Sequence, residues 1–279
     1  MTAPLVPTSP VILNTRPLPM GETLALDLAE HGIEAISFPT IVNLALCNED
    51  IAAHSNQSFA QLLQIIIEHL SNENAYWLFI SKSSAQFFRQ FLQSFSTNAH
   101  AFEFSPAGHV IAVGATTKSE IETINSTLNV LTPVEANSEA LLAMPEFEFC
   151  QKLVLVKGLG GRGLITEHFT QQHKQVVELN LYQRSAQLYE KQEIESWLTT
   201  GIILATSVDI ASATLDNINL LTEAQRQQFL QSKHWIVLSD RIKQFLISKS
   251  VKKQNIFVCE QSDNSSIIKM IKQIGKASS

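Results

Sequence analysis

The 279-residue sequence has few cysteines, few charges and no long apolar run, and each scarcity excludes a class of protein. Cys47, Cys150 and Cys259 stand far apart without a CxxC pair. Their spacing argues against a disulfide framework or a zinc site, and predicts buried thiols in a reducing compartment. The longest aliphatic run, residues 62–67, is interrupted by Gln64 and is far shorter than a bilayer span. We therefore expect a cytoplasmic protein without a membrane segment.

An excess of basic residues is also missing. The sequence has 20 Lys and Arg against 26 Asp and Glu, which gives a formal net charge of −6. Nucleic-acid-binding surfaces are usually basic, so this balance argues against a nucleic-acid partner. The first ten residues, MTAPLVPTSP, lack a basic segment followed by an apolar one, so we expect no secretion signal.

Apolar residues are abundant and follow a regular alternation. They make up 45% of the chain, which excludes intrinsic disorder, and the length predicts two domains. Short apolar runs are followed by turns of small polar residues and then by amphipathic segments. This pattern favours the α/β class, with parallel sheets covered on both faces. The predicted strands are residues 11–14, 76–80, 110–113, 153–156, 202–205 and 235–238.

A weak internal repeat supports two similar α/β domains. YWLFIS followed by KSSAQFF parallels GIILATS followed by VDIASATL, and HVIAVG parallels WIVLS. These two pairs are separated by about the same distance, whereas a third pair, VILNTRP and LVLVKGL, is further apart. Convergent strand–helix patterning would produce part of this likeness, so gene duplication is one of two explanations.

Candidate ligand sites lie where predicted strands lead into helices. In parallel α/β sheets, ligands bind beyond the carboxyl ends of the strands, and helix N-termini there favour anions. A carboxylate or phosphate ligand is therefore expected. Ser and Thr are also preferred helix caps without any ligand, so capping alone remains the alternative at each loop. The loops are residues 15–17, 81–83, 114–117, 158–163, 206–207 and 239–241.

One loop carries a nucleotide-binding pattern. Residues 158–163 read GLGGRG, which satisfies GxGxxG after a predicted strand, and Glu178 lies about 20 residues further on. Such glycines admit a pyrophosphate, and the acid would bind ribose hydroxyls. Against this, the motif begins in mid-chain and Glu178 lies inside VVELNLY instead of at a strand end. An NAD(P)-binding protein stays an alternative.

Other catalytic patterns are scarce. The sequence has no HExxH, GxSxG or GxxxxGK[ST], so metalloprotease, hydrolase and P-loop interpretations lack residues. Tyr182 follows a strand-like run and is a candidate for a hinge or site position. Its alternative is an interfacial aromatic residue with a hydrated hydroxyl.

Taken in order, these segments resemble the uroporphyrinogen-III synthase family over nearly the whole chain. The likeness is most specific in VKGLGGRGLI, which includes Gly158 and Arg162, and in the following LYQR, which includes Tyr182. The remaining matching segments are Thr15-Arg16-Pro17, Phe79-Ile80-Ser81, VGATT ending at Thr117, Thr206-Ser207 and Ser239-Asp240-Arg241.

The resemblance implies two flavodoxin-like α/β domains joined by a two-stranded linker, with the N-terminal segment packing against the C-terminal half. One domain would comprise residues 11–37 and 184–279, and the other residues 43–179. The linkers would be residues 38–42 and 180–183.

The family reaction is cyclisation of the linear tetrapyrrole hydroxymethylbilane to uroporphyrinogen III, in a cleft between two domains. Water is lost and the last pyrrole ring is inverted, without a metal or organic cofactor. The resemblance also implies a monomer and transient contact with the preceding enzyme of haem biosynthesis. A non-catalytic homologue that only binds tetrapyrroles is the alternative within the family.

The resemblance assigns roles to particular residues. Tyr182 would be catalytic and would assist departure of the hydroxyl group. The sequence departs from the family at Ile80, where Thr is usual, at Ser83, where Asn is common, and in the long polar stretch of residues 48–58. The implied substrate-binding residues are Arg16, Ser81, Lys82, Ser83, Thr117, Thr206, Ser207 and Ser239.

Overall fold

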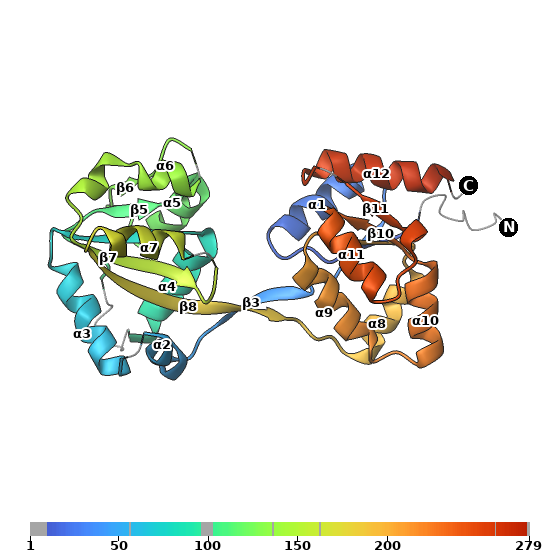
Figure 1. Cartoon of the computed structure of the whole chain (residues 1–279), viewed down its shortest axis with the longest axis horizontal. Coiled ribbons are helices and arrows are strands. Elements are labelled where there is room, and N and C mark those ends of the chain that lie inside the picture. The colour runs from blue at the N-terminus through green and yellow to red at the C-terminus, as the bar shows by residue number, and fades with distance from the viewer. Residues whose placement is uncertain are drawn as a thin grey trace. The chain divides into compact units, whose positions relative to one another are not determined.

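The computed structural model describes residues 10–55, 57–95, 103–135, 137–161, 163–259 and 261–277 (Figure 1). The chain forms two compact units. Unit 1 comprises Met1–Val42 and Ser185–Ser279, and unit 2 comprises Asn43–Arg184. Each unit contains one sheet dominated by parallel strands, which confirms the predicted fold class of two similar α/β domains.

Unit 1 contains a five-stranded sheet in the order β11-β10-β9-β1-β2, and all its strand pairs are parallel. Counted along unit 1, this order is 2-1-3-4-5, the flavodoxin-like order. The elements are β1 (Ile12–Asn14), α1 (Met20–Glu30), β2 (Ala35–Ser37), α8 (Lys191–Ser196), η2 (Trp197–Thr199), β9 (Ile202–Ala205), α9 (Val208–Ile218), α10 (Glu223–Ser232), β10 (His234–Val237), α11 (Asp240–Ser248), η3 (Lys253–Asn255), β11 (Ile256–Val258) and α12 (Asn264–Ala277).

Helices cover both faces of the unit 1 sheet. Leu13 and Ile203 pack into the cluster formed with α9 and α11. Their neighbours Ile12 and Ile202 pack on the other face, against α1 and α12. This alternation follows from the two-residue period of a strand, and it explains why the strands are apolar throughout.

Unit 2 contains a six-stranded sheet in the order β3-β8-β7-β4-β5-β6. Trp77 and Phe79 pack toward α3 and α4, whereas Tyr76 and Leu78 face the cluster that includes α6 and α7. The elements are β3 (Ile41–Ala45), α2 (Asn48–His54), α3 (Phe59–Leu70), β4 (Ala75–Phe79), α4 (Lys82–Phe95), β5 (Val110–Ala112), α5 (Ala115–Glu122), β6 (Val130–Leu131), α6 (Ser138–Leu142), η1 (Pro145–Glu148), β7 (Lys152–Gly158), α7 (Leu164–Gln171) and β8 (Gln175–Ala186).

Strands β3 and β8 differ from the other pairs. The Leu46 N–H donates to the Leu181 carbonyl at 2.9 Å, and the Gln187 N–H donates to the Thr40 carbonyl at 2.9 Å. The residue numbers rise on one segment and fall on the other, so the two segments run antiparallel. The boundaries between the units fall within these same two strands.

The polar stretch before α3 is helical in part. Residues 48–54 form α2, and Cys47 precedes it as an exposed residue. The prediction of three buried thiols was therefore wrong for Cys47, because it lies at a helix start beside Glu49 and Asp50. Cys150 and Cys259 are buried. Burial raises the pKa of the Cys150 thiol to about 11.

Candidate functional site

Tyr182 lies in β8, where that strand pairs irregularly with β7. Lys157 pairs with Asn180 and Gly158 pairs with Tyr182, so β8 has one extra residue at this point. Tyr182 is only 8% exposed, and its ring stacks on Phe87 of α4 with centroids 4.8 Å apart and planes 20° apart. The irregular pairing and the stacking place the ring over the start of α4.

Gly158 is required beside Tyr182 for a steric reason. A Cβ atom on this glycine would lie 2.5 Å from Cε2 of the Tyr182 ring, which no side chain can tolerate without movement. The next residue, Leu159, donates its N–H to the Tyr182 carbonyl at 2.6 Å. The start of the glycine-rich loop therefore packs directly against Tyr182.

The Tyr182 hydroxyl meets a helix cap. Its Oη lies 3.0 Å from Oγ of Ser81, the residue that precedes α4. Ser81 Oγ also accepts the Ser84 N–H at 3.0 Å, while Ser84 Oγ accepts the Ser81 N–H at 3.1 Å. Lys82 and Ser83 are the first residues of the helix after this reciprocal cap. Their backbone N–H groups lie at the N-terminal, positive end of the helix dipole and have no partner within the helix.

The side chains of these first residues of α4 have weak partners. Lys82 Nζ lies 3.9 Å from a Glu120 carboxylate oxygen, and Lys82 is 45% exposed. The Glu120 carboxylate also pairs with Arg89 Nη2 at the shorter distance of 3.4 Å, so Lys82 can exchange Glu120 for another anion without leaving that carboxylate unpaired. Ser83 Oγ accepts a hydrogen bond from Asn43 Nδ2 at 3.1 Å.

Thr117 lies on the helix next to α4, but its side chain is buried. It lies in α5, which follows β5, the neighbour of β4, so both helices begin at the same edge of the sheet. Thr117 is 2% exposed, and its N–H donates to the Gly114 carbonyl at 3.1 Å. The amides that begin α5 belong to Ala115 and Thr116, which precede the predicted residue.

The predicted residues of unit 1 also share one sheet edge. Thr206 and Ser207 follow β9, and Ser239 follows the adjacent β10. Ser207 Oγ accepts the Ile210 N–H at 3.2 Å and caps α9. Ser239 precedes α11 and accepts the Lys243 N–H through its carbonyl at 3.2 Å. The structure brings these three together within unit 1, and Ser81, Lys82, Ser83, Thr117 and Tyr182 together within unit 2.

Arg16 is buried and tied to other parts of unit 1. It is 7% exposed, and its Nη1 donates to Asn264 Oδ1 at 2.8 Å. Asn264 in turn donates to Asp27 at 2.6 Å, which links the loop after β1 to α12 and α1. Arg16 Nε has no hydrogen-bond partner in the described part of the chain, and burial lowers the pKa of the guanidinium. Arg162, the other arginine of the resemblance, lies outside the described residues.

Glu178 has two protein partners within unit 2. It pairs with Lys157 Nζ at 3.3 Å, and it accepts a hydrogen bond from Thr166 Oγ1. Lys157 is only 6% exposed, so Glu178 serves as the counter-charge of a buried cation. A dinucleotide site would need this carboxylate for ribose hydroxyls, so the nucleotide alternative loses the acid on which it depended.

Two residues of the Tyr182 environment were not predicted as such. Phe87 was not singled out, although it lies four residues after Ser83 and therefore on the same helical face. Gly158 was noted in a nucleotide motif and in the glycine-rich segment of the family resemblance, but not as a neighbour of Tyr182. The spacing on α4 and the glycine motif were the available signals, but neither identifies the aromatic ring that both residues contact.

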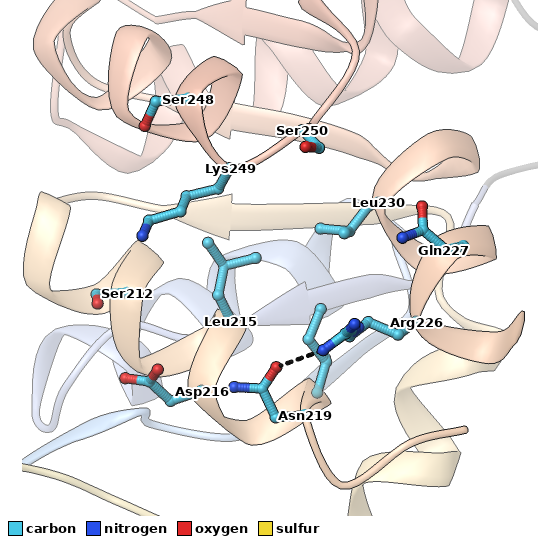
Figure 2. Close-up of a pocket in the computed structure, with 11 residues that line it drawn as sticks. Ser212, Leu215, Asp216, Asn219, Arg226, Gln227, Leu230, Ser248, Lys249 and Ser250 are labelled. Carbon is cyan, nitrogen blue, oxygen red and sulfur yellow. Dashed lines mark hydrogen bonds between the residues drawn. The ribbon is translucent and has the colours of Figure 1, made fainter. Parts of the chain in front are cut away.

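A separate groove of about 400 Å³ lies on unit 1 (Figure 2). Leu215 comes from α9 and Asn219 follows the end of that helix, while Arg226 comes from α10 and Lys249 follows α11. Arg226 donates to Asn219 at 3.2 Å. Because helices run back from the carboxyl edge of a parallel sheet, these helix ends lie toward its amino edge. None of the predicted site residues is among the residues that line this groove.

Two properties of the described residues concern membranes and metal ions. No helix in the described ranges is long and apolar enough to cross a membrane. No group of three or more His, Cys, Asp or Glu side chains in those ranges is arranged to hold a metal ion.

Known proteins resemble this chain over almost its full length. The family described as uroporphyrinogen-III synthase HemD matches residues 22–269. The chain is 28% identical over 265 residues to uroporphyrinogen-III synthase of Salmonella typhimurium, covering 93% of this chain and 99% of the relative. It is 24% identical over 268 residues to the Escherichia coli enzyme of the same name, with the same coverage of 93% and 99%. Uroporphyrinogen-III synthetase from Helicobacter pylori shares the fold, with a TM-score of 0.54, 9% identity and coverage of 95% and 99%.

Proposed function

The chain belongs to the uroporphyrinogen-III synthase family, and we propose that it catalyses the cyclisation of hydroxymethylbilane to uroporphyrinogen III. In this step of haem biosynthesis, the linear tetrapyrrole loses water and its last pyrrole ring is inverted. The observation that carries the proposal is the Tyr182 hydroxyl, which meets Ser81 beside the N-terminus of α4 at the carboxyl edge of a parallel sheet.

The substrate carries acetate and propionate carboxylates on every ring, so it needs several anion contacts. In unit 2 we assign these contacts to the amides of Lys82 and Ser83, to Lys82 Nζ, and to the amides that begin α5, while the buried Thr117 orders that first turn through its bond to the Gly114 carbonyl. Amides at the positive end of a helix bind anions without a basic surface. This is compatible with the net charge of −6.

Unit 1 offers donors of the same kind. We assign further carboxylate contacts to the N-termini of α9 and α11, through Thr206, Ser207 and Ser239. The cap formed by Ser207 supports this assignment, because its carbonyl and hydroxyl organise the first turn while leaving the first amides available. For Arg16, the buried network with Asn264 and Asp27 supports a role in ordering the loop that precedes α1.

Tyr182 would act as the proton donor to the departing hydroxyl. The carbon–oxygen bond of the hydroxymethyl group breaks, and the electron pair leaves with the oxygen, which takes the Tyr182 proton and departs as water. The pyrrole nitrogen lone pair supplies electrons to the remaining carbon, giving a cationic methylene-pyrrole and a Tyr182 oxyanion. Closure of the ring releases a proton that returns to this oxygen. Proton donation of this kind contributes about 10²–10⁴-fold in rate.

Orientation of the substrate would supply the rest. The open chain closes spontaneously without inversion, so the enzyme must hold it folded with the last ring correctly placed. Catalysis by positioning needs few acid–base residues, and the scarcity of catalytic motifs in the sequence is compatible with it. Residues 38–42 and 180–183 would be the linkers between the two domains.

The proposal includes the oligomeric state, the compartment and the source of the substrate. We expect a cytoplasmic monomer that receives its unstable substrate from the preceding enzyme through transient contact. The three free thiols support a reducing compartment. Sedimentation equilibrium tests the monomer, and a dimer at micromolar concentration would contradict it.

A coupled assay tests the proposed reaction. Porphobilinogen and hydroxymethylbilane synthase generate the substrate, and the oxidised products are separated as uroporphyrin isomers I and III. We expect isomer III only when this protein is present. Isomer I alone, from protein shown to be folded by circular dichroism, would contradict the proposal and favour a homologue that only binds tetrapyrroles.

A further inference from the structure

The Tyr182 side chain is held on three sides by residues of unit 2. Its ring stacks on Phe87 at 4.8 Å, and it leaves no room for a Cβ on Gly158. Its hydroxyl lies 3.0 Å from Ser81 Oγ. The first two contacts restrict the ring by packing, so within the described ranges the Ser81 contact decides where the hydroxyl hydrogen points.

The hydrogen-bonding capacity of Ser81 limits the possible arrangements. A serine hydroxyl has one hydrogen to donate and two lone pairs to accept with. One lone pair of Ser81 accepts the Ser84 N–H at 3.0 Å. If Tyr182 donated to the other lone pair, the tyrosine hydrogen would be occupied and unable to reach a substrate. If Ser81 donates, the tyrosine hydrogen is free.

We propose that Ser81 is a positioning residue that acts through Tyr182, instead of a direct ligand of a substrate carboxylate. Ser81 donates its hydroxyl hydrogen to Tyr182 Oη, so the tyrosine hydrogen points at the leaving hydroxyl. When Tyr182 gives up its proton, Ser81 keeps its own and hydrogen-bonds to the oxyanion left on Oη. This inference rests on the proposed function, since it concerns the same step.

The two roles exclude each other because Ser81 has a single hydroxyl hydrogen. A hydrogen donated to Tyr182 cannot at the same time be donated to a carboxylate. The Ser81 N–H is also engaged, since it donates to Ser84 Oγ at 3.1 Å. Anion binding at this helix is thereby left to the amides and side chains of Lys82 and Ser83.

Unit 1 contains a matched residue for comparison. Ser207 follows β9 as Ser81 follows β4, and Ser207 Oγ accepts the Ile210 N–H at 3.2 Å in the same type of cap. Of the three tyrosines, Tyr182 bonds to Ser81, Tyr189 bonds to the Pro39 carbonyl, and Tyr76 packs against His109 and Phe147 in unit 2. Ser207 therefore caps its helix as Ser81 does, but among the described residues its hydroxyl does not contact a tyrosine hydroxyl.

A double-mutant cycle in the coupled assay tests the inference. We expect Ser81→Ala to lower kcat about 10-fold with KM changed by less than about 2-fold, and Ser81→Thr to restore most of kcat. In the Tyr182→Phe background, the Ser81→Ala effect should fall below about 2-fold, because the partner hydroxyl is gone. Ser81→Gly is the second variant, since glycine is tolerated at a helix cap and also lacks the hydroxyl.

The Ser207→Ala variant is the control for the cycle. Its effect should be the same in the wild-type and Tyr182→Phe backgrounds, because Ser207 does not contact that tyrosine. The inference is overturned if Ser81→Ala raises KM at constant kcat, as loss of a carboxylate ligand would. An equal Ser81→Ala effect in both backgrounds would overturn it too.

A spectroscopic measurement tests the contact without any activity. The chain has three tyrosines, so fluorotyrosine labelling should give three ¹⁹F signals, and Tyr182→Phe identifies one of them. We expect Ser81→Ala to shift that signal and Ser207→Ala to leave it in place. An unchanged Tyr182 signal in Ser81→Ala would refute the inference, whereas absence of isomer III from the wild-type protein would refute the proposed function instead.

Discussion

The two units have the same sheet, reached in a different chain order. In unit 1 the spatial order is β11-β10-β9-β1-β2, and in unit 2 it is β6-β5-β4-β7-β8 with β3 added beyond β8. Strands β9, β10 and β11 therefore match β4, β5 and β6, while β1 and β2 match β7 and β8. The strand orders of the units are circularly permuted, because the strands that match β1 and β2 come last in unit 2, whereas β1 and β2 come first in unit 1. The VILNTRP–LVLVKGL pair is further apart than the other two repeat pairs because the chain from β1 to β4 is longer than the chain from β7 to β9, and it includes α2 within the polar stretch of residues 48–58.

The matched strand ends differ where the chemistry is proposed. At the last pair of β7 and β8, Gly158 lies opposite Tyr182. At the last pair of β1 and β2, Asn14 lies opposite Ser37, and Asn14 Nδ2 donates to Ser37 Oγ at 3.2 Å. One scaffold thus carries a compact polar pair in unit 1 and an aromatic hydroxyl over a glycine in unit 2. Helix caps are common to both units, but the tyrosine environment belongs to unit 2.

The largest expected effect comes from removing the hydroxyl of Tyr182. We expect Tyr182→Phe to lower kcat by at least about 10²-fold, because the leaving group loses its proton donor. The control is Tyr189→Phe in unit 1, whose hydroxyl donates to the Pro39 carbonyl at 3.0 Å. That variant should cost about 1 kcal/mol in the free energy of unfolding and change kcat by less than about 2-fold. Similar losses of kcat in both variants would remove the distinction between the units.

Gly158→Ala tests whether the glycine of unit 2 makes room for the ring. Its Cβ would lie 2.5 Å from the Tyr182 ring, so the ring must move and kcat should fall at least about 10-fold. Gly160→Ala is the matched control, since Gly160 has a φ of +82° but nothing within 4 Å of its added Cβ. We expect it to cost about 1 kcal/mol in the free energy of unfolding with little change in kcat. Steady-state kinetics and urea unfolding of both variants would show whether the steric contact matters.

The caps of unit 1 should act through backbone amides, which proline can remove selectively. Val208 is the first residue of α9, where proline is tolerated, and Ser207 before it has the extended conformation that precedes proline. We expect Val208→Pro to raise KM about 10-fold and Ser207→Ala only about 3-fold, since the amides survive the second change. A larger KM effect for Ser207→Ala would identify the side chain as the ligand. Circular dichroism checks that α9 is retained.

The smallest effect that we expect is on the free energy of unfolding at acidic pH. It should be found for the carboxylate before α12 of unit 1 and not for the neutral cap of α4 of unit 2. Asp263 precedes α12 and accepts hydrogen bonds from Ser265 Oγ and from the Ser266 N–H at 2.9 Å. Hydrogen bonding, from the Ser265 side chain first, lowers the Asp263 pKa from 3.8 to about 2. The folded-state pKa is depressed, so this contribution is present above pH 3.8 and is lost as pH falls toward about 2.

Asp263→Ala should therefore narrow the difference in unfolding free energy between about pH 5 and about pH 3, as measured by urea titration. The effect is small because the carboxylate is fully exposed. Helix α4 has the neutral cap Ser81, so Ser81→Gly should not alter the pH dependence in this window. Equal pH profiles for wild type and Asp263→Ala would contradict this prediction.

The fold class was predictable because buried parallel strands are continuous apolar runs. The runs at β1, β4, β7, β9 and β10 are buried on both faces, which makes them conspicuous in the sequence. Strand β2 is half-exposed, so it lacks the continuous apolar run that marks the buried strands, including β1 of the same length. The start of α3 can be recognised in the sequence, because Ser58 and Gln61 have the spacing of the capping box that they form.

The candidate site was predictable as loops and residue types, but not as contacts. Helix N-termini after parallel strands follow from alternation alone, so Ser81, Ser207 and Ser239 could be named from the sequence. Arg16 was named in the same way, yet it lies in a buried network with Asn264, which is 248 residues away in the chain. A motif predicts that a residue lies in a loop, but the hydrogen-bond partner of its side chain can belong to a segment that is distant in the sequence.

The α/β class, the repeat and the small polar loops at the strand ends can be read from the amino-acid sequence, because they depend on local periodicity and on the burial of each strand. The contact of Tyr182 with Ser81, 101 residues earlier in the chain, and the packing of Gly158 and Phe87 against its ring depend on tertiary packing. The irregular pairing of β7 with β8 sets these contacts, because one extra residue in a strand redirects every side chain that follows it.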